Sequence, residues 1–398
     1  MNERQSILST VSIYHALNDG AVSVIPILFP IFKTIFNLSY TQVGIITGGA
    51  LLINLISQLL IGRYADGKNF RTMLTLGILL ISLSMFLLTN VNGFITLGIF
   101  IFLLRFSSSF FHPIGIGWIS RTFKKYRLDH AMGIQSGFAD IGSFIAISTT
   151  LYITDIFSWD FPLLLWSLAG GIIVISGIFL TRNIDEKYLK VKKEIKKQNF
   201  NQAIDEAIRF LERIKLLIPA FMVTGASWGV IITYLPLLLS ERTNLSLPII
   251  GIIVSIWIGI GTISTFLYGR INDHIGRKNV LLISYLTIGI SGIILAIISN
   301  IFIYLILMVL LGISVFLTFP TLASFVSENT DESVEGRTFG VVFTLQLGGG
   351  TILLFIGGAL SDIIGIWIPF AIIGVLSLLV ALILRVYYTS DYIKTYTK

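Results

Sequence analysis

The sequence predicts an all-α membrane protein in which twelve transmembrane helices form two six-helix halves. Three observations lead to this prediction. Of the 398 residues, 55% are hydrophobic and only 12% are charged, whereas a soluble domain has roughly 25% charged residues. The charges leave twelve apolar stretches, each about as long as the ~20 residues that a helix needs to cross a bilayer. The chain also repeats itself at an offset of 207 residues.

Charged and turn-forming residues separate the apolar stretches and set the predicted helix ends. In the first half the predicted spans are residues 7–32, 40–62, 72–90, 94–119, 131–154 and 160–181. In the second half they are residues 214–239, 247–269, 279–298, 301–326, 338–360 and 365–387. Between the halves lies the one long charged segment. A run of lysines there is followed by Ile204, Ile208 and Leu211, which are spaced as on one face of a helix. We expect either a helix on the membrane surface or a solvated linker there.

Landmark residues show that the repeat runs without a gap. Asn37-Leu38-Ser39 recurs as Asn244-Leu245-Ser246. Five single residues return in order, as the pairs Pro113/Pro320, Gly133/Gly340, Gly142/Gly349, Asp155/Asp362 and Pro162/Pro369. Because each half has an even number of spans, the two halves enter the membrane in the same direction, as parallel repeats related by an axis along the membrane normal. The predicted domains are residues 1–181, a cytoplasmic linker at 182–213, and residues 214–398.

The positive charges favour one side of the predicted topology. With a cytoplasmic N-terminus and alternating loops, 25 of the 28 Lys and Arg residues fall on the cytoplasmic side. Such a bias is the usual determinant of orientation, and it explains the net charge of +7 without nucleic acid as a partner. We expect a multi-pass protein of the plasma membrane with both termini in the cytoplasm. The absence of cysteine excludes disulfides and thiolate metal sites.

A charged turn follows the second span of each half. In the second half it reads Gly269-Arg270-Ile271-Asn272-Asp273-His274-Ile275-Gly276-Arg277-Lys278. We expect Gly269 to let neighbouring helices approach closely and Asp273 to accept hydrogen bonds from a helix N-terminus. The first-half copy has Asn69 in the place of Gly276. Because Asn tolerates a left-handed backbone better than most residues, we expect the turn to survive this change.

This turn resembles the signature loop between the second and third helices of each half in the major facilitator superfamily. The resemblance covers essentially the whole chain, and it implies the major facilitator fold, transport by alternating access and a functional monomer. In that fold spans 1, 4, 7 and 10 line the cavity, and span 5 packs beside them. The residues that it implies for a conformational gate are Gly62, Arg63, Asp66, Arg71, Gly269, Arg270, Asp273, Gly276, Arg277 and Lys278.

Three patches show a narrower resemblance within that superfamily. They are His15-Ala16-Leu17-Asn18-Asp19 in span 1, Ser108-Ser109-Phe110-Phe111-His112-Pro113 in span 4, and Gln135-Ser136 in span 5. They are similar to the fosmidomycin-resistance branch, which implies proton-driven export of small drugs. Arg105 resembles the fourth-span arginine of drug antiporters. Span 5 has spaced glycines without the proline that such antiporters commonly carry there.

Ionisable residues are buried in only one copy of the repeat. His15, Asp19, Arg105, His112 and Asp140 align with Met222, Ala226, Gly312, Phe319 and Leu347. A charge at the bilayer centre costs about 2.5–3.5 kcal/mol on insertion scales, so such residues face cavities or partners. At ~1.5 Å per residue, both carboxylates and Arg105 lie near mid-depth. We therefore predict a charged cluster inside the N-terminal half.

Each member of this cluster suits a task in proton coupling. Burial favours the neutral form of Asp19 and Arg105 favours its anion, so its protonation can change as the cavity switches exposure. Arg105 is predicted to be its counter-ion or the anchor for an anionic substrate. Asp140 can balance Arg105 or act as a second proton site. His15 and His112 can relay protons. The structural alternative is a static Asp–Arg pair that holds spans 1, 4 and 5 together.

The remaining expectations concern the substrate and the class of protein. The predicted cavity residues are Asn18, Arg105, Gln135, Gln346 and Trp228. We favour proton-coupled export of a small amphipathic or anionic compound. The alternatives are a proton-coupled symporter that imports a metabolite or organic anion, a divalent metal exporter that uses His15, Asp19, His112 and Asp140, and a receptor that does not transport. No nucleophile with its base and no nucleotide loop is evident, so we expect neither an enzyme nor a protein with a cofactor or resident metal.

Overall fold

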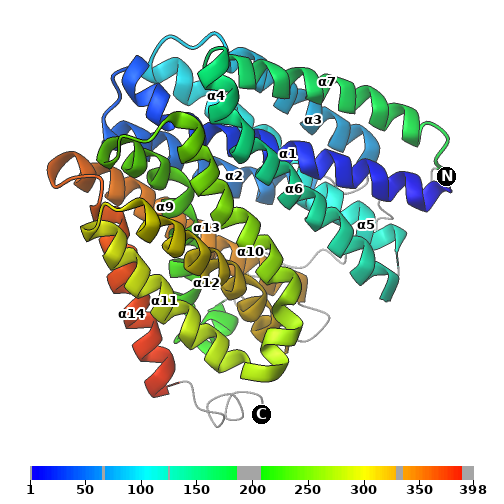
Figure 1. Cartoon of the computed structure of the whole chain (residues 1–398). Helices are drawn as coiled ribbons and strands as arrows, with labels where there is room; N and C mark the ends of the chain where they lie inside the picture. The colour runs from blue at the N-terminus through cyan, green and yellow to red at the C-terminus, as the bar shows by residue number, and fades with distance from the viewer. Residues whose placement is uncertain (1, 65–67, 124–125, 186–207, 329–334, 388–398) are drawn as a thin grey trace. The chain divides into compact units, whose positions relative to one another are not determined.

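The computed structural model describes residues 2–64, 68–123, 126–185, 208–328 and 335–387, and every regular element among them is a helix (Figure 1). The chain divides into two compact units. One comprises residues 1–194 and 244–255, and the other comprises residues 195–243 and 256–398. Each unit is described by itself.

Twelve helices in the described part of the chain are long and apolar enough to cross a membrane, which confirms the predicted number. In the first half they are α1 (Glu3–Ile35), α2 (Tyr40–Tyr64), α3 (Phe70–Leu88), α4 (Phe94–Ser108) with its continuation, α6 (Tyr126–Ile156) and α7 (Phe161–Thr181). The continuation of α4 consists of the π-helix η1 (His112–Ile116) and α5 (Gly117–Thr122). In the second half they are α9 (Ile218–Arg242), α10 (Leu247–Ile275), α11 (Arg277–Ile297), α12 (Ile301–Glu328), α13 (Glu335–Ile363) and α14 (Ile368–Tyr387).

Helix starts repeat at the offset found in the sequence. The helices α2, α3, α4 and α7 have their counterparts in α10, α11, α12 and α14. Their first residues form the pairs Tyr40/Leu247, Phe70/Arg277, Phe94/Ile301 and Phe161/Ile368, each 207 residues apart. The sequence repeat is therefore also a repeat of helix boundaries. The predicted domain limits stay a prediction, because residues 186–207 of the linker lie outside the described residues. Of its apolar residues, Ile204 falls in that gap, while Ile208 and Leu211 lie in described residues that are helical.

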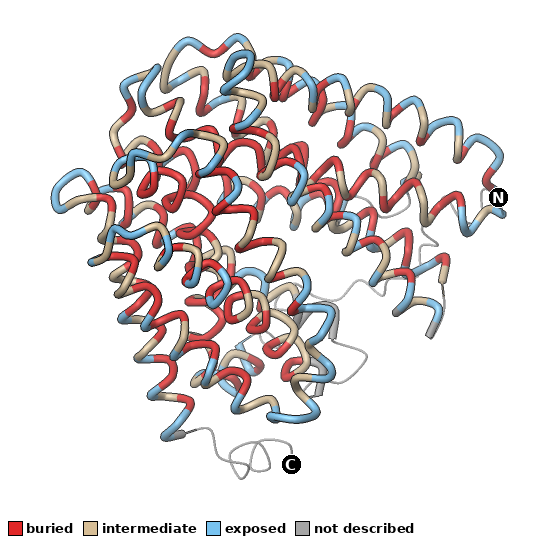
Figure 2. Tube along the Cα trace, in the orientation of Figure 1, coloured by how far each residue is buried: buried red, intermediate tan, exposed pale blue. Residues whose placement is uncertain are grey.

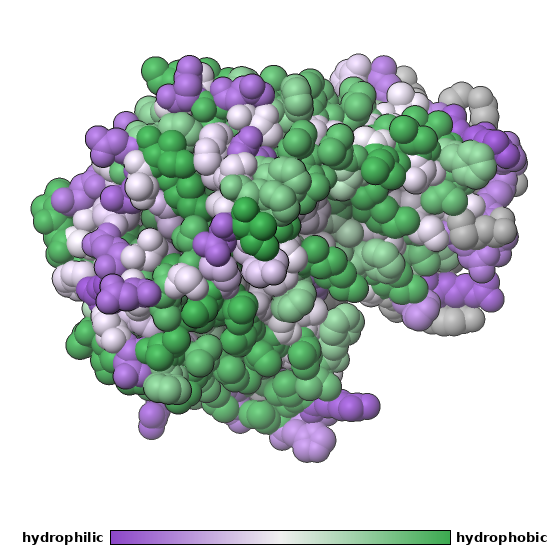
Figure 3. Space-filling view, turned by 45° about the horizontal axis from the view of Figure 1, so that its top comes forward, coloured by the Kyte–Doolittle hydropathy of each residue, from purple (hydrophilic) through white to green (hydrophobic). Residues whose placement is uncertain are grey.

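The outer helix surfaces are apolar, as a lipid-facing surface requires. Figure 3 shows hydrophobic side chains over much of the visible surface. Among the exposed residues are Ile95, Ile172 and Phe266, each with more than half of its surface accessible. By contrast, α1 and α9 are mostly buried, and Figure 2 shows buried residues along most of α1. The helix that carries His15 and Asp19 is thus an inner helix of its unit.

The two copies of the charged turn start the next helix by different means. Gly276 precedes α11 with φ 81°, a backbone conformation that favours glycine. Asn69 precedes α3 with φ −82° and ψ 116°, and its side chain accepts a hydrogen bond from the backbone N–H of Thr72. The expectation of a left-handed Asn69 is therefore wrong. Asparagine works here as an N-cap, which satisfies a free N–H of the helix through its side chain.

Glycine allows a close helix contact in each half. On α6, a Cβ at Gly142 would collide with the backbone carbonyl of Ala16 on α1. On α13, a Cβ at the aligned Gly349 would collide with the backbone carbonyl of Met222 on α9. Small residues at such crossings let helix backbones touch within a membrane. The repeat has therefore kept the same close crossing in both halves.

We predict that Gly142→Val destabilises the first half, because the new side chain meets backbone atoms that cannot rotate away. Overpacking costs about 1–3 kcal/mol, so the purified variant should unfold at a lower temperature than the wild type. The matched control is Gly133→Val on the same helix, where a Cβ meets nothing within 4 Å. The pair Gly349→Val and Gly340→Val repeats the comparison in the second half. Equal melting temperatures within each pair would contradict the close crossing.

Candidate functional site

His15 and Asp19 form the centre of the candidate site. They lie one turn apart on α1, and His15 Nε2 is 3.6 Å from Asp19 Oδ2. His15 is 5% exposed, whereas about a third of the Asp19 side chain remains accessible. The other carboxylate oxygen, Oδ1, accepts a 2.7 Å hydrogen bond from the side-chain amide of Asn18. The carboxylate is thus held on one side by an amide and faces an imidazole on the other.

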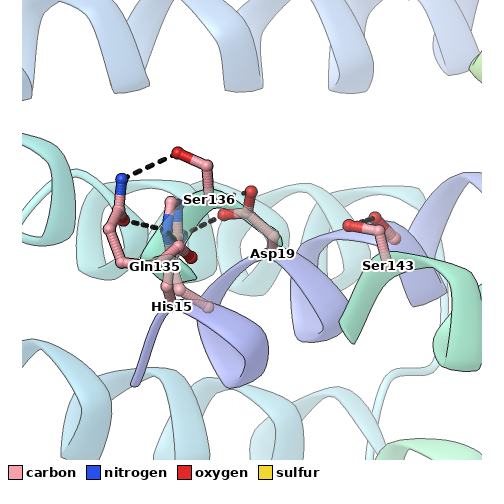
Figure 4. Close-up of polar contacts among 7 residues, drawn as sticks. His15, Asp19, Gln135, Ser136 and Ser143 are labelled. Carbon is pink, nitrogen blue, oxygen red and sulfur yellow. Dashed lines mark hydrogen bonds and ion pairs between the residues drawn. The ribbon is translucent and has the colours of Figure 1, made fainter. Parts of the chain in front are cut away.

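Gln135 on α6 fixes the opposite edge of the His15 ring. His15 Nδ1 lies 2.5 Å from Gln135 Oε1 and 3.1 Å from the Gln135 backbone oxygen. The Gln135 side-chain amide in turn donates to Ser136 Oγ. Figure 4 shows the imidazole between Gln135 and Asp19, where α1 lies against α6. Because carbonyl oxygens can only accept a hydrogen bond, the hydrogen of a neutral His15 ring lies on Nδ1. Nε2 has no hydrogen-bond partner within the described structure.

His112 joins this pair from the continuation of α4. The helix is disturbed between Ser108 and His112, and a π-helix runs from His112 to Ile116, with Pro113 near its start. Such π-helical turns are frequent at functional sites. Phe111 stacks on the His15 ring at a centroid distance of 4.0 Å, and His112 meets that ring edge-on at 5.6 Å. The sequence analysis named Phe111 only within the span 4 patch and gave it no role, although its place beside His112 was a usable signal.

Three of the predicted site residues converge closely enough to share one ligand. The imidazole nitrogens of His15 and His112 and a carboxylate oxygen of Asp19 all lie within 4.8 Å of one another. Among the described residues, these three form the group of His, Asp and Glu side chains that is close enough to hold one metal ion. These three residues are therefore the ones that could hold a cation.

Arg105 and Asp140 lie farther out and interact with Asp19 through the electric field. Both are half-buried, Arg105 on α4 and Asp140 on α6. The charge of Asp19 acts on each of them. Within the described part of the chain, neither has an oppositely charged side chain within 4.0 Å. The direct contact of Asp19 is with His15, so the static Asp–Arg pair that we considered as a structural alternative is not formed.

The second half has no comparable polar site at the aligned positions. Gln346 on α13 is 7% exposed, and Trp228 on α9 is half-buried. The Trp228 ring lies 6.3 Å from the ring of the fully buried Trp257, which in turn packs against Phe316. This part of the second unit is an aromatic core with Trp228 at its edge.

The gate residues differ in what the structure assigns to them. Arg71 donates a 2.8 Å hydrogen bond to the carbonyl of Thr181, the last residue of α7. A Cβ at Gly269 would meet nothing within 4 Å, so the expectation of a close helix approach at Gly269 is wrong. Asp273 is exposed, and its side chain has no hydrogen bond to another described residue. Asp66 and the side chain of Arg63 lie outside the described residues. Gly62, Arg270, Arg277 and Lys278 lie at helix ends flanking the two turns.

Comparison with known proteins identifies the family. The sequence profile described as Major Facilitator Superfamily matches residues 11–353 and, in a second match, residues 217–398. The chain is 24% identical over 390 residues to the "Uncharacterized MFS-type transporter YfnC" of Bacillus subtilis (strain 168), with 95% of this chain and 92% of that protein covered. It is also 24% identical over 364 residues to "Multidrug resistance protein 2" of the same organism, with coverages of 89% and 88%.

Solved structures share the same architecture. The nucleoside transporter NupG superposes with a TM-score of 0.77 at 15% identity, covering 98% of this chain and 100% of that one. A bacterial homolog of the human lysosomal transporter Spinster gives 0.73 at 13% identity, covering 100% and 97%. At such identities the likeness concerns the fold alone. It confirms the predicted twelve-helix major facilitator fold, while the narrower resemblance to the fosmidomycin-resistance branch stays a prediction. Because the family profile matches most of the chain, the chain belongs to the major facilitator superfamily and is a multi-pass membrane transporter of a small-molecule substrate, not an enzyme.

Proposed function

We propose that this transporter exports a small amphipathic or anionic compound in exchange for protons. The observation that carries the proposal is the contact between His15 and Asp19, two proton-binding side chains on the inner helix α1. Export is favoured by relatives named multidrug resistance proteins. Besides the Bacillus protein, these include MdtG of Proteus mirabilis, which is 28% identical over 179 residues, or 42% of each chain.

The proton site follows from the orientation of the His15 ring. Gln135 accepts the Nδ1 hydrogen, so the lone pair of a neutral His15 points toward Asp19 Oδ2. A lone pair and an ionised carboxylate 3.6 Å apart repel one another in a medium of low dielectric constant. One proton, on either group, converts this repulsion into attraction. We propose that the pair takes up one proton and releases it as alternating access changes its surroundings.

Neighbouring charges adjust how firmly that proton is held. The charge of Asp19 interacts with those of Arg105 and Asp140. His112, beside His15 at the π-helix, is the next proton carrier along the path. Asn18 and Gln135 orient the pair through their amides. In this scheme a change of exposure during alternating access moves the proton on or off the pair.

The substrate side of the proposal rests on Arg105. Its guanidinium has no carboxylate within 4.0 Å in the described structure, which leaves its donors available to an anionic group. We propose Asn18 and Gln135 as further cavity residues in the first half, and Gln346 and Trp228 in the second. The residues of the two charged turns are proposed to gate the alternating movement.

The second candidate function is proton-coupled uptake of a metabolite or organic anion. It uses the same Arg105 anchor and the same proton pair, with proton and substrate moving in one direction. We further propose a functional monomer in the plasma membrane, as the family resemblance implies. The Lys and Arg distribution supports the proposal that both termini lie in the cytoplasm.

We predict that neutral His15 is the tautomer with its hydrogen on Nδ1. The reason is that Nδ1 faces the backbone oxygen and Oε1 of Gln135, and both oxygens accept a hydrogen bond. Nitrogen-15 NMR on protein labelled only at its four histidines would report the tautomer. His15→Met identifies the His15 signal by its loss. Methionine is chosen because Met222 stands at the aligned position of the second half. A His15 hydrogen on Nε2 would refute the proposed orientation.

Asp19→Asn is expected to abolish substrate-driven proton movement, because the amide has the same shape but cannot take up the proton. Everted vesicles with a proton-sensitive dye, challenged with drugs, phosphonates and organic anions, provide the measurement. Asp155→Asn, an exposed carboxylate near the end of α6, is the control and should transport like the wild type. Undiminished proton movement in Asp19→Asn removes Asp19 from the coupling site. Uptake of labelled substrate down an inward proton gradient, without exchange, favours the symporter.

Cysteine labelling tests the orientation, because the natural chain has no cysteine. Asn92→Cys, in the exposed turn between α3 and α4, should react with a membrane-impermeant maleimide on intact cells. His274→Cys, exposed near the end of α10, should react only after the cells are made permeable. The reverse pattern would place the termini outside the cell.

A further inference from the structure

We propose that His15, Asp19 and His112 form a binding site for a divalent transition-metal ion, with Zn²⁺ as the representative. The sequence analysis predicted no resident metal, and the proposal goes beyond proton coupling. Two imidazole nitrogens and one carboxylate oxygen are ligands that suit Zn²⁺ and its first-row neighbours better than Mg²⁺ or Ca²⁺. All three ligand atoms lie within 4.8 Å of one another.

The spacing of the ligand atoms fits one small ion. Two ligand atoms that are each ~2.1 Å from a tetrahedral Zn²⁺ lie about 3.4 Å apart. His15 Nε2 and Asp19 Oδ2 are already 3.6 Å apart. The His112 nitrogen lies within 4.8 Å of both other ligand atoms, and a small inward movement of its side chain completes the set. Three protein ligands leave a fourth position for water, which is the arrangement of an accessible zinc site.

A buried polar atom points into this site without a partner. His15 is 5% exposed, and its Nε2 has no hydrogen bond within the described structure. The ring cannot escape by turning over, because Gln135 holds Nδ1 and Phe111 stacks on its face. An unpaired nitrogen in such surroundings costs free energy. A bound cation would satisfy it.

The outer contacts are those of a metal site. A ligating histidine commonly donates its other N–H to a carbonyl or carboxylate oxygen, and ligating carboxylates are themselves hydrogen-bonded. Here His15 donates Nδ1–H to Gln135, and Asp19 accepts from Asn18. Access is also provided, because about a third of the Asp19 side chain is exposed.

The charge of the surroundings tolerates a divalent ion. Arg105 is a cation whose charge interacts with that of Asp19, and it opposes the binding of a second cation. Asp140 also acts on Asp19 and offsets that positive charge. With neutral imidazoles, Asp19, Asp140 and Arg105 together carry one net negative charge. Because ligands must be deprotonated to bind a metal, Zn²⁺ and the coupling proton compete for the same atoms.

Calorimetric titration of the purified full chain with Zn²⁺ tests the proposal, using an affinity tag that contains no histidine. We expect one Zn²⁺ per chain at this site. His112→Phe should weaken Zn²⁺ binding at least tenfold. Phenylalanine is chosen because Phe319 stands at the aligned position of the second half. The chain has four histidines, and the other two, His130 and His274, are exposed. The matched control His130→Asn/His274→Asn should bind as the wild type does. Loss of binding in that control, or unchanged binding in His112→Phe, overturns the site.

A measurement on the wild-type chain avoids reliance on variants that fail to fold. Paramagnetic Co²⁺ at one equivalent should perturb the histidine NMR signals of His15 and His112 and leave those of His130 and His274 unchanged. Perturbation of the exposed pair alone overturns the proposal. Both experiments measure binding without transport. They can therefore fail while proton coupling stands, and proton coupling can fail while they succeed.

Discussion

The crossing of α1 and α6 is the contact on which the chemistry of the first half depends. Gly142 lets the α6 backbone touch that of α1 at Ala16, the neighbour of His15 in the chain. Only at this spacing can Gln135 reach the His15 ring with both its side chain and its backbone oxygen. The ring then presents Nε2 to Asp19. A wider crossing would leave the ring free to turn, and the carboxylate would lose its defined partner.

The second half shows that this crossing belongs to the framework and that the polar residues were added to it or lost from it. Gly349 and Met222 repeat the backbone contact, and the helix starts repeat at the same offset. Met222 and Phe319 stand where the first half has His15 and His112. Buried charge is costly in a membrane, whereas apolar packing at these positions is not. One half can therefore carry the chemistry while the other keeps only the shape.

The sequence was sufficient for the features that depend on local length and composition. Span number and helix starts followed from apolar stretches of bilayer length and from the 207-residue repeat, and His15 and Asp19 face each other because they are one helical turn apart. Contacts across the fold could not be predicted in the same way. Gln135 lies 120 residues from His15, and no pattern in the chain links the two. Asn69 was misjudged because its capping bond depends on the helix that follows it, and Gly269 because helix separation is a tertiary property.

The confinement of charge to one half constrains how coupling can work. A proton that binds the His15–Asp19 pair changes the charge of the first half by one unit. The aligned positions of the second half offer no ionisable side chain to compensate. Within the cluster, Arg105 keeps its charge under nearly all conditions, so Asp140, His112 and the substrate are the partners that can respond. An anion on Arg105 favours protonation of the pair, which is the linkage that the symporter requires, whereas exchange requires a substrate whose binding displaces the proton. Proton and substrate can thus be linked through the electrostatics of a single half, while the apolar second half contributes the moving wall.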